Sequence, residues 1–188
     1  MDDVTALLTR HKLDVDQYYL MAVVGILDRD ARVELIDGEI IDMAPIGEDH
    51  ISTVNRLNRA LVMTCGERAI VSVQNPVRLD RFNEPEPDFA LLRPRDDFYA
   101  ARKAGADAVL LLIEVSKSSV RFDKTVKLAL YARFGIPEYW LVNLETRVLE
   151  AYRLVDGQYG TPGEHGAGET LALVAAPDIG ITLDRLFG

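Results

Sequence analysis

Residues 109–115 constrain the fold of this chain more than any other stretch, because six apolar residues there are interrupted by one carboxylate, Glu114. A short and almost wholly apolar run is typical of a strand that is buried on both faces. A carboxylate in such a strand is costly unless it is paired or bound to a metal. The run therefore predicts a sheet covered by helices, and a partner for Glu114, either Arg121, Lys127 or a cation.

Strand patterns lie on both sides of this run. Residues 32–43 contain two β-rich segments that flank Asp37 and Gly38, the strongest short-range signal for a hairpin turn. A second hairpin is predicted for residues 138–153, and the five glycines of residues 156–168 predict a solvated loop. Further strands are expected at three places: residues 69–79, the residues that follow Asp88, and residues 171–174.

Helical periodicity is clearest after the first hairpin. Apolar side chains fall on one stripe of a helix that begins at Asp49 or Ser52 and ends at Cys65, with Gly66 as its C-cap. A helix is also predicted for residues 122–133, and another is expected to begin at Asp14 or Asp16. The stripe comprises Ile51, Val54, Leu57, Leu61 and Val62. Weaker helical turns are expected around Val4, Leu7 and Leu8, over residues 96–103, and over residues 183–187.

Composition places the chain among ordinary globular proteins. Its 188 residues, 48% apolar and 27% charged, fit one domain over residues 1–188, an α/β domain with a mixed twisted sheet flanked by helices. No apolar run is long enough to cross a membrane. The single cysteine, Cys65, excludes an internal disulfide and is typical of a small core residue. We therefore expect a cytoplasmic protein.

Two acids from different strands could hold a metal ion. Asp88 stands between Pro87 and Phe89 at the start of its strand, and Glu114 ends the buried run. Alone, Asp88 is typical of a turn residue after a proline. Together with the carbonyl of Val115, however, the two carboxylates would offer Mg²⁺ (or Mn²⁺) the oxygen ligands that it prefers and leave positions for water and phosphate.

A cation beside this site would complete a phosphodiesterase. Lys127 is the main candidate, because Asp123, Lys127 and Tyr131 recur at a helical spacing on one face, with Lys124 beside them. The alternative is a surface ion pair of the kind that most helices carry. Lys117 is a rival, because it is closer in sequence to Glu114.

Two further residues are candidates for a supporting role. Glu34 would add an acid if its strand lies beside that of Asp88, although alone it is typical of a half-exposed strand residue. His50 could contact phosphate or carry a proton, although a lone histidine at a helix start is more often a polar cap. The sequence contains no zinc-binding spacing, no phosphate-binding glycine loop and no nucleophile elbow for a serine hydrolase.

At these residues the chain resembles the Uma2 family of restriction-endonuclease-like proteins, within the PD-(D/E)XK nuclease superfamily. The resemblance implies a nuclease core in which Asp88 and Glu114 bind a divalent metal. The superfamily's lysine would stand at Ser116, and relatives in the Uma2 family are thought to supply it from the next helix, which here is Lys127. The resemblance covers nearly the whole chain and lies in residues 34–39 (ELIDGE), His50, Glu86-Pro87-Asp88, residues 113–116 (IEVS), residues 123–127 (DKTVK) with Tyr131, and residues 135–142 (GIPEYWLV).

The sequence thus leaves two interpretations open. The first is a Mg²⁺-dependent endonuclease acting on nucleic acid, with DNA as the expected substrate, Asp88, Glu114, Lys127 and Glu34 as catalytic residues, and His50, Lys117, Lys124 and Tyr131 as candidate substrate contacts. The second is a non-catalytic binding or assembly module on the same fold, which the net charge of −9 and the serine at position 116 favour. A homodimer is suggested by Tyr139, Trp140 and Tyr152 as exposed apolar candidates. A phosphate-guiding patch would be drawn from Arg56, Arg59, Arg93, Arg95, Arg102 and Lys103.

Overall fold

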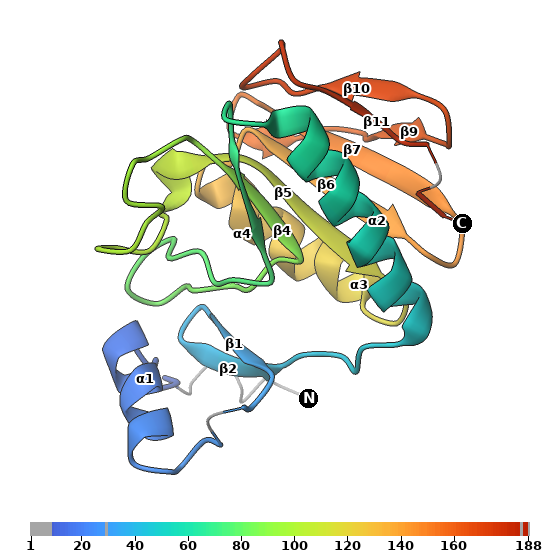
Figure 1. Cartoon of the computed structure of the whole chain (residues 1–188). Coiled ribbons are helices and arrows are strands. Elements are labelled where there is room, and N and C mark those ends of the chain that lie inside the picture. The colour runs from blue at the N-terminus through green and yellow to red at the C-terminus, as the bar shows by residue number, and fades with distance from the viewer. Residues whose placement is uncertain (1–8, 29, 185, 188) are drawn as a thin grey trace.

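The computed structural model describes residues 9–28, 30–184 and 186–187. The turn expected at Val4, Leu7 and Leu8 lies outside these ranges. A mixed sheet forms the centre of the fold, and helices cover both of its faces (Figure 1). The predicted α/β class with a mixed sheet flanked by helices is therefore confirmed.

The N-terminal part forms a small helix-and-hairpin unit below the sheet in Figure 1. Helix α1 (Val15–Val23) begins at Asp14, whose side chain accepts a hydrogen bond from the backbone N–H of Gln17 in a capping box. The predicted hairpin is present as β1 (Val33–Ile36) and β2 (Glu39–Asp42). Its turn works as the sequence predicts, since Asp37 and Gly38 both have positive φ angles, 51° and 74°.

The central sheet has the order β3-β4-β5-β6-β7-β8, and β9 also pairs with β7. Strands β5 and β6 run parallel and the other pairs are antiparallel, which makes the sheet mixed. The buried run predicted at residues 109–115 is its central strand, and every residue of that strand is buried. The strands are β3 (Ile70–Val73), β4 (Phe89–Leu92), β5 (Val109–Ser116), β6 (Glu138–Asn143), β7 (Val148–Val155), β8 (Gln158–Tyr159) and β9 (Gly163–His165).

Each face of the sheet has its own apolar core. Helix α2 (Glu48–Cys65) covers one face, and the helical segment made of α3 (Val120–Phe122), η3 (Asp123–Lys127) and α4 (Leu128–Arg133) covers the other. Alternation along β5 explains the two cores, because Ile113 and Val115 face α2 while Leu112 faces α4. Glu114 therefore belongs to the face of the sheet that α4 covers.

Helix α2 agrees with its predicted stripe only in part. Val54, Leu57 and Leu61 are buried against the sheet, and so is Cys65, as expected. The outer members of the stripe, Ile51 and Val62, do not belong to the buried face. They are 49% and 53% exposed, because the sheet contacts a narrower sector of this helix than the pattern suggested.

Several expectations about exposure are wrong. Tyr139 and Trp140 are fully buried in β6, and Tyr152 is 6% exposed in β7, because both faces of the sheet are covered: Trp140 packs in one apolar core and the two tyrosines in the other. The homodimer therefore stays a prediction, and the residues that suggested it are not exposed.

No helix in the described part of the chain is long and apolar enough to cross a membrane.

The glycine-rich and C-terminal segments also differ from expectation. Residues 156–168 are not one loop, since they contribute β8 and β9 to the sheet. The strand expected at residues 171–174 is β10 (Thr170–Ala172), which pairs with β11 (Gly180–Thr182), a strand that the sequence did not indicate. Residues 96–103 form turns rather than a helix, and the described part of residues 183–187 contains no helix either.

Candidate active site

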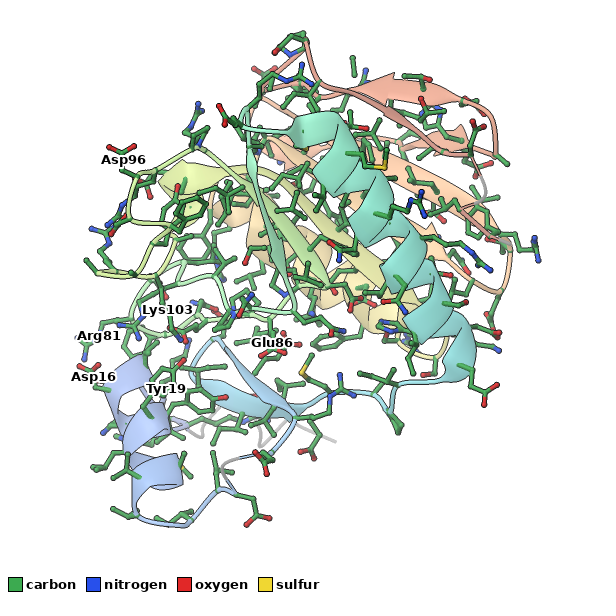
Figure 2. All side chains as sticks on the ribbon, viewed as in Figure 1. Asp16, Tyr19, Arg81, Glu86, Asp96 and Lys103 are labelled. Carbon is green, nitrogen blue, oxygen red and sulfur yellow. The ribbon has the colours of Figure 1, made fainter. Side chains whose placement is uncertain are left out.

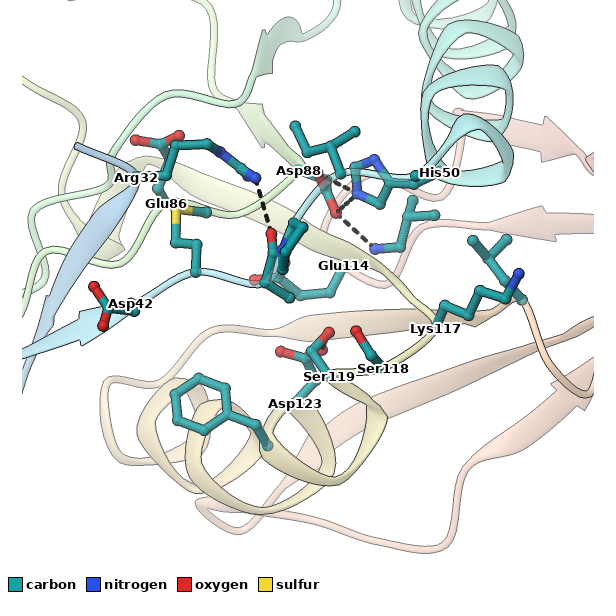
Figure 3. A pocket seen from close by; sticks show the side chains of 18 of the residues that line it. Arg32, Asp42, His50, Glu86, Asp88, Glu114, Lys117, Ser118, Ser119 and Asp123 are labelled. Carbon is teal, nitrogen blue, oxygen red and sulfur yellow. Dashed lines mark hydrogen bonds and ion pairs between the residues drawn. The ribbon is translucent and has the colours of Figure 1, made fainter. Parts of the chain in front are cut away.

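A cleft of about 660 Å³ opens where the hairpin unit meets the sheet. Its walls come from the β1–β2 hairpin, the segment leading into α2, the ends of β4 and β5, and the start of the α3–η3 helix (Figure 3). Acidic side chains outnumber basic ones in its lining. The charged and polar lining residues are Arg32, Glu34, Asp42, Glu48, Asp49, His50, Glu86, Asp88, Glu114, Lys117, Ser118, Ser119, Asp123 and Lys127.

Sheet register brings the two predicted acids together. Phe89 of β4 pairs with Ile113 of β5 in an antiparallel ladder. Asp88 and Glu114 are the next residues beyond this pair, and the contact between them is continued by the backbone N–H of Val115, which donates to Asp88 Oδ2. Both side chains line the cleft, and so does Val115.

Asp88 is held by donors from three directions. Its Oδ2 accepts a hydrogen bond from the backbone N–H of Val115 at 2.8 Å, and its Oδ1 accepts one from Gln74 Nε2 at 3.1 Å. His50 Nε2 lies 3.0 Å from both carboxylate oxygens. Burial raises the pKa of Asp88, but these donors, His50 first among them, outweigh burial and hold the pKa below its ordinary value. Asp88 is therefore a carboxylate rather than a carboxylic acid.

Glu114 is the partner of Lys127. Its Oε1 accepts hydrogen bonds from Lys127 Nζ and from the Tyr131 hydroxyl, each at 2.9 Å, and no described residue donates to Oε2. The Lys127 ammonium also lies 3.1 Å from Glu34 Oε2. Of the two partners that the sequence offered for Glu114, the structure thus pairs it with Lys127 and not with Arg121.

The charge state of this group follows from its burial. Burial disfavours the charged form and lowers the pKa of Lys127, but the carboxylates of Glu114 and Glu34 reverse the effect and hold the pKa well above its ordinary value. Burial also raises the pKa of Glu114 well above its ordinary value, with Lys127 opposing it. The Lys127 ammonium is thus the cation that neutralises two buried acids.

The helix that carries Lys127 contains a π-helical segment, η3. This wider turn separates α3 from α4 and carries Asp123 and Lys127, both buried toward the cleft. Asp123 Oδ2 accepts hydrogen bonds from the hydroxyls of Ser116 and Ser119. Such segments occur frequently at functional sites, and the two buried side chains of this one both contact β5, Asp123 at Ser116 and Lys127 at Glu114.

Other predicted residues lie at different places. Lys117 lines the cleft and pairs with Asp49 at 2.8 Å, both being exposed. Lys124 does not line the cleft, and its ammonium pairs with Glu150 of β7 at 2.6 Å. Tyr131 is fully buried behind Glu114, so its hydroxyl contacts the acid rather than the cleft. None of the residues from which a phosphate-guiding patch was expected lines the cleft; they are Arg56, Arg59, Arg93, Arg95, Arg102 and Lys103.

The structure brings to this site four residues for which the sequence predicted no role there. Gln74 follows β3 and donates to Asp88, and Asp123 lies beside Ser116. Glu86 lines the cleft between two prolines, and its backbone N–H donates to Glu34 Oε2 at 3.1 Å. Arg32 supplies the cleft with a cation and donates to the carbonyl of Ala44 at 2.8 Å. Local signals existed for two of them: Glu86 (labelled in Figure 2) stands two residues before Asp88, and Asp123 stands four residues before Lys127 on the same helical face.

Comparison with known proteins is consistent with this geometry. The sequence model of the Uma2 family, described as "Putative restriction endonuclease", matches residues 15–184. The chain also superposes on the crystal structure of a protein from Anabaena variabilis described as a "putative nuclease belonging to DUF820", with a TM-score of 0.67 and 15% identity over 93% of this chain and 97% of that one. At that identity the likeness shows the fold alone. No curated protein matches the sequence.

Proposed function

We propose that this chain, which belongs to the Uma2 family, is a divalent-metal-dependent endonuclease that hydrolyses phosphodiester bonds, with DNA as its substrate. The observation that carries the proposal is the meeting of Asp88, Glu114 and a buried lysine in one cleft. Two carboxylates and a cation on adjacent elements are the groups that phosphodiester hydrolysis needs. The nuclease-like fold of the Anabaena variabilis protein supports the same conclusion.

The donor set of the cleft fits a hard cation such as Mg²⁺ or Mn²⁺. Asp88 is held as an anion, Glu114 Oε2 receives no hydrogen bond from the described residues, and Val115 lines the same wall. Within the described ranges, no three His, Cys, Asp or Glu side chains are grouped so that they could hold a metal ion. Mg²⁺ is commonly bound through one or two carboxylates, with water and phosphate oxygens completing its shell.

We assign the metal to Asp88, Glu114 and the carbonyl of Val115. When bound there, a divalent ion supplies Lewis-acid polarisation of a phosphoryl oxygen and activation of water. Lys127 is proposed to hold its proton throughout and to place a positive charge beside the phosphate as negative charge develops. Its burial strengthens this interaction, because a charge in a low-dielectric site acts more strongly than one in water.

The remaining residues of the cleft orient these groups. Glu34 and Glu114 hold the Lys127 ammonium from two sides, at 3.1 and 2.9 Å. Tyr131 directs Glu114 by donating to the same oxygen that Lys127 contacts. Lys117 and Arg32 are the cleft's other cations, and we expect them to contact phosphates that flank the cleaved bond.

A cleavage assay tests this function. Plasmid and single-stranded DNA are incubated with the protein in Mg²⁺, in Mn²⁺ and in EDTA, and products are separated on gels. We expect cleavage only with a divalent ion, and its loss in Asp88→Asn and Glu114→Gln. Glu150→Gln is the matched control, because Glu150 is a buried acid that pairs with a lysine outside the cleft.

The alternative is a non-catalytic binding or assembly module. One observation favours it: the only cation at Glu114 among the described residues, Lys127, is already committed to two carboxylates. If wild type and both cleft variants give the same products in every metal condition, the module is the better account.

A further inference from the structure

Three donors surround the carboxylate of Asp88 in this structure. A carboxylate offers about four lone-pair sites on its two oxygens. Gln74 Nε2 occupies a site on Oδ1, and the backbone N–H of Val115 occupies one on Oδ2. His50 Nε2 faces the remaining side, at 3.0 Å from both oxygens (Figure 3). A cation that takes the side of the carboxylate now faced by His50 must therefore displace that ring.

The three donors differ in their freedom to leave. The N–H of Val115 belongs to the backbone of a central buried strand, so it cannot move without the sheet. Gln74 does not line the cleft, and its departure would open a site on the wrong side of the carboxylate. His50 does line the cleft, from the first turn of α2, and its side chain keeps 17% of its surface exposed. His50 is therefore the donor that stands between Asp88 and the cleft.

The other nitrogen of the His50 ring gives an independent reason for its departure. His50 Nδ1 is buried and has no hydrogen-bond partner, and it is the one side-chain nitrogen or oxygen in the described part of the chain in that condition. A buried polar atom without a partner is costly. The ring is thus held in place by its single contact with Asp88, and rotation toward the open cleft would let Nδ1 reach water.

We infer that His50 occupies the position on Asp88 that a divalent cation takes, and that the ring swings away from Asp88 when the cation binds. This inference rests on the proposed metal site, and it adds that His50 competes with the cation for Asp88. In the absence of a cation, His50 keeps the Asp88 carboxylate paired and in place. Once released, the ring lies in the cleft, where it can donate to a phosphate oxygen of the substrate.

Metal titration distinguishes a competitor from a supporting residue. Mn²⁺ binding to the metal-free protein is measured by calorimetry for wild type, His50→Ala and Gln74→Ala. Removing a competitor strengthens binding, so His50→Ala should bind Mn²⁺ about tenfold more tightly, because a hydrogen bond to a charged group no longer has to be broken. Gln74→Ala removes a donor that the metal does not displace. This variant should therefore bind Mn²⁺ as tightly as wild type or more weakly.

The outcomes separate this inference from the proposed function. Binding in wild type with unchanged or weaker affinity in His50→Ala would overturn the competitor role and leave the metal site intact. A lack of Mn²⁺ binding in wild type and His50→Ala alike would refute the metal site, and the inference with it. Circular dichroism confirms that the variants are folded. A crystal structure with Mn²⁺ bound should place His50 Nε2 beyond hydrogen-bonding distance of Asp88.

Discussion

Replacing Lys127 by methionine is the sharpest test of the buried charge group. The ammonium lies 2.9 Å from Glu114 and 3.1 Å from Glu34, with the three side chains 5%, 7% and 3% exposed. Methionine keeps the length of the side chain but removes its charge, so two buried acids lose the cation that lies between them. Breaking a buried ion pair in this way costs about 3–5 kcal/mol. For a chain of this size, that lowers the melting temperature by roughly 6–20 °C.

The same helical segment provides a matched control. Lys124 pairs with Glu150 at 2.6 Å, but its own side chain is 37% exposed and Glu150 keeps a hydrogen bond from the Tyr152 hydroxyl, so Lys124→Met should cost clearly less than Lys127→Met. Urea unfolding in EDTA at neutral pH, followed by circular dichroism, gives both free energies. Adding Glu34→Gln to Lys127→Met should recover part of the loss, because one of the unpaired charges is removed. Equal costs for the two lysine variants would refute the assignment of Lys127 as the cation of a buried group.

Three further outcomes follow from local geometry. Gly38→Ala should lower the free energy of unfolding by about 1–3 kcal/mol, because φ is +74° and the new Cβ would lie 2.6 Å from Lys12 Cβ; an unchanged urea midpoint would contradict this. Tyr131→Phe should cost about 1–2 kcal/mol, since Glu114 loses one of its two donors, and an effect below 0.5 kcal/mol would show that the hydroxyl does not stabilise the acid. Folding lowers the pKa of Asp88, so the ionised carboxylate stabilises the protein above the unfolded value of 3.8, and this stabilisation is lost as pH falls through the folded value. The difference in unfolding free energy between wild type and Asp88→Asn should therefore shrink below pH 3.8. A difference that stays constant from pH 7 to 3 would contradict this.

Features with a local cause could be predicted from the sequence. Asp37 and Gly38 specify their turn by backbone preference alone, and the hairpin follows from the flanking residues. The apolar run that ends at Glu114 predicts a central strand, because no other environment accommodates it. Alternation then puts the carboxylate on a single face of that strand.

Features that depend on distant parts of the chain could not be predicted. The contact of Asp88 with Gln74 and His50 joins a strand start, a loop and a helix, and no periodicity in the sequence encodes it. Tyr139 was expected to be exposed, but its ring packs against those of Tyr131 and Tyr152 in the apolar core on its face of the sheet. The glycine content of residues 156–168 predicted a loop, but β9 pairs with β7 there. Pairing with an existing strand outweighs the weak β preference of glycine.

The position of a divalent ion in a crystal tests the central proposal most directly. Crystals soaked in Mn²⁺ are measured by anomalous diffraction. The proposal predicts a peak in the cleft, within roughly 2.0–2.6 Å of carboxylate oxygens of Asp88 and Glu114 and of the Val115 carbonyl. A fully soaked crystal with no peak there, or with Mn²⁺ bound only elsewhere on the protein, would contradict it.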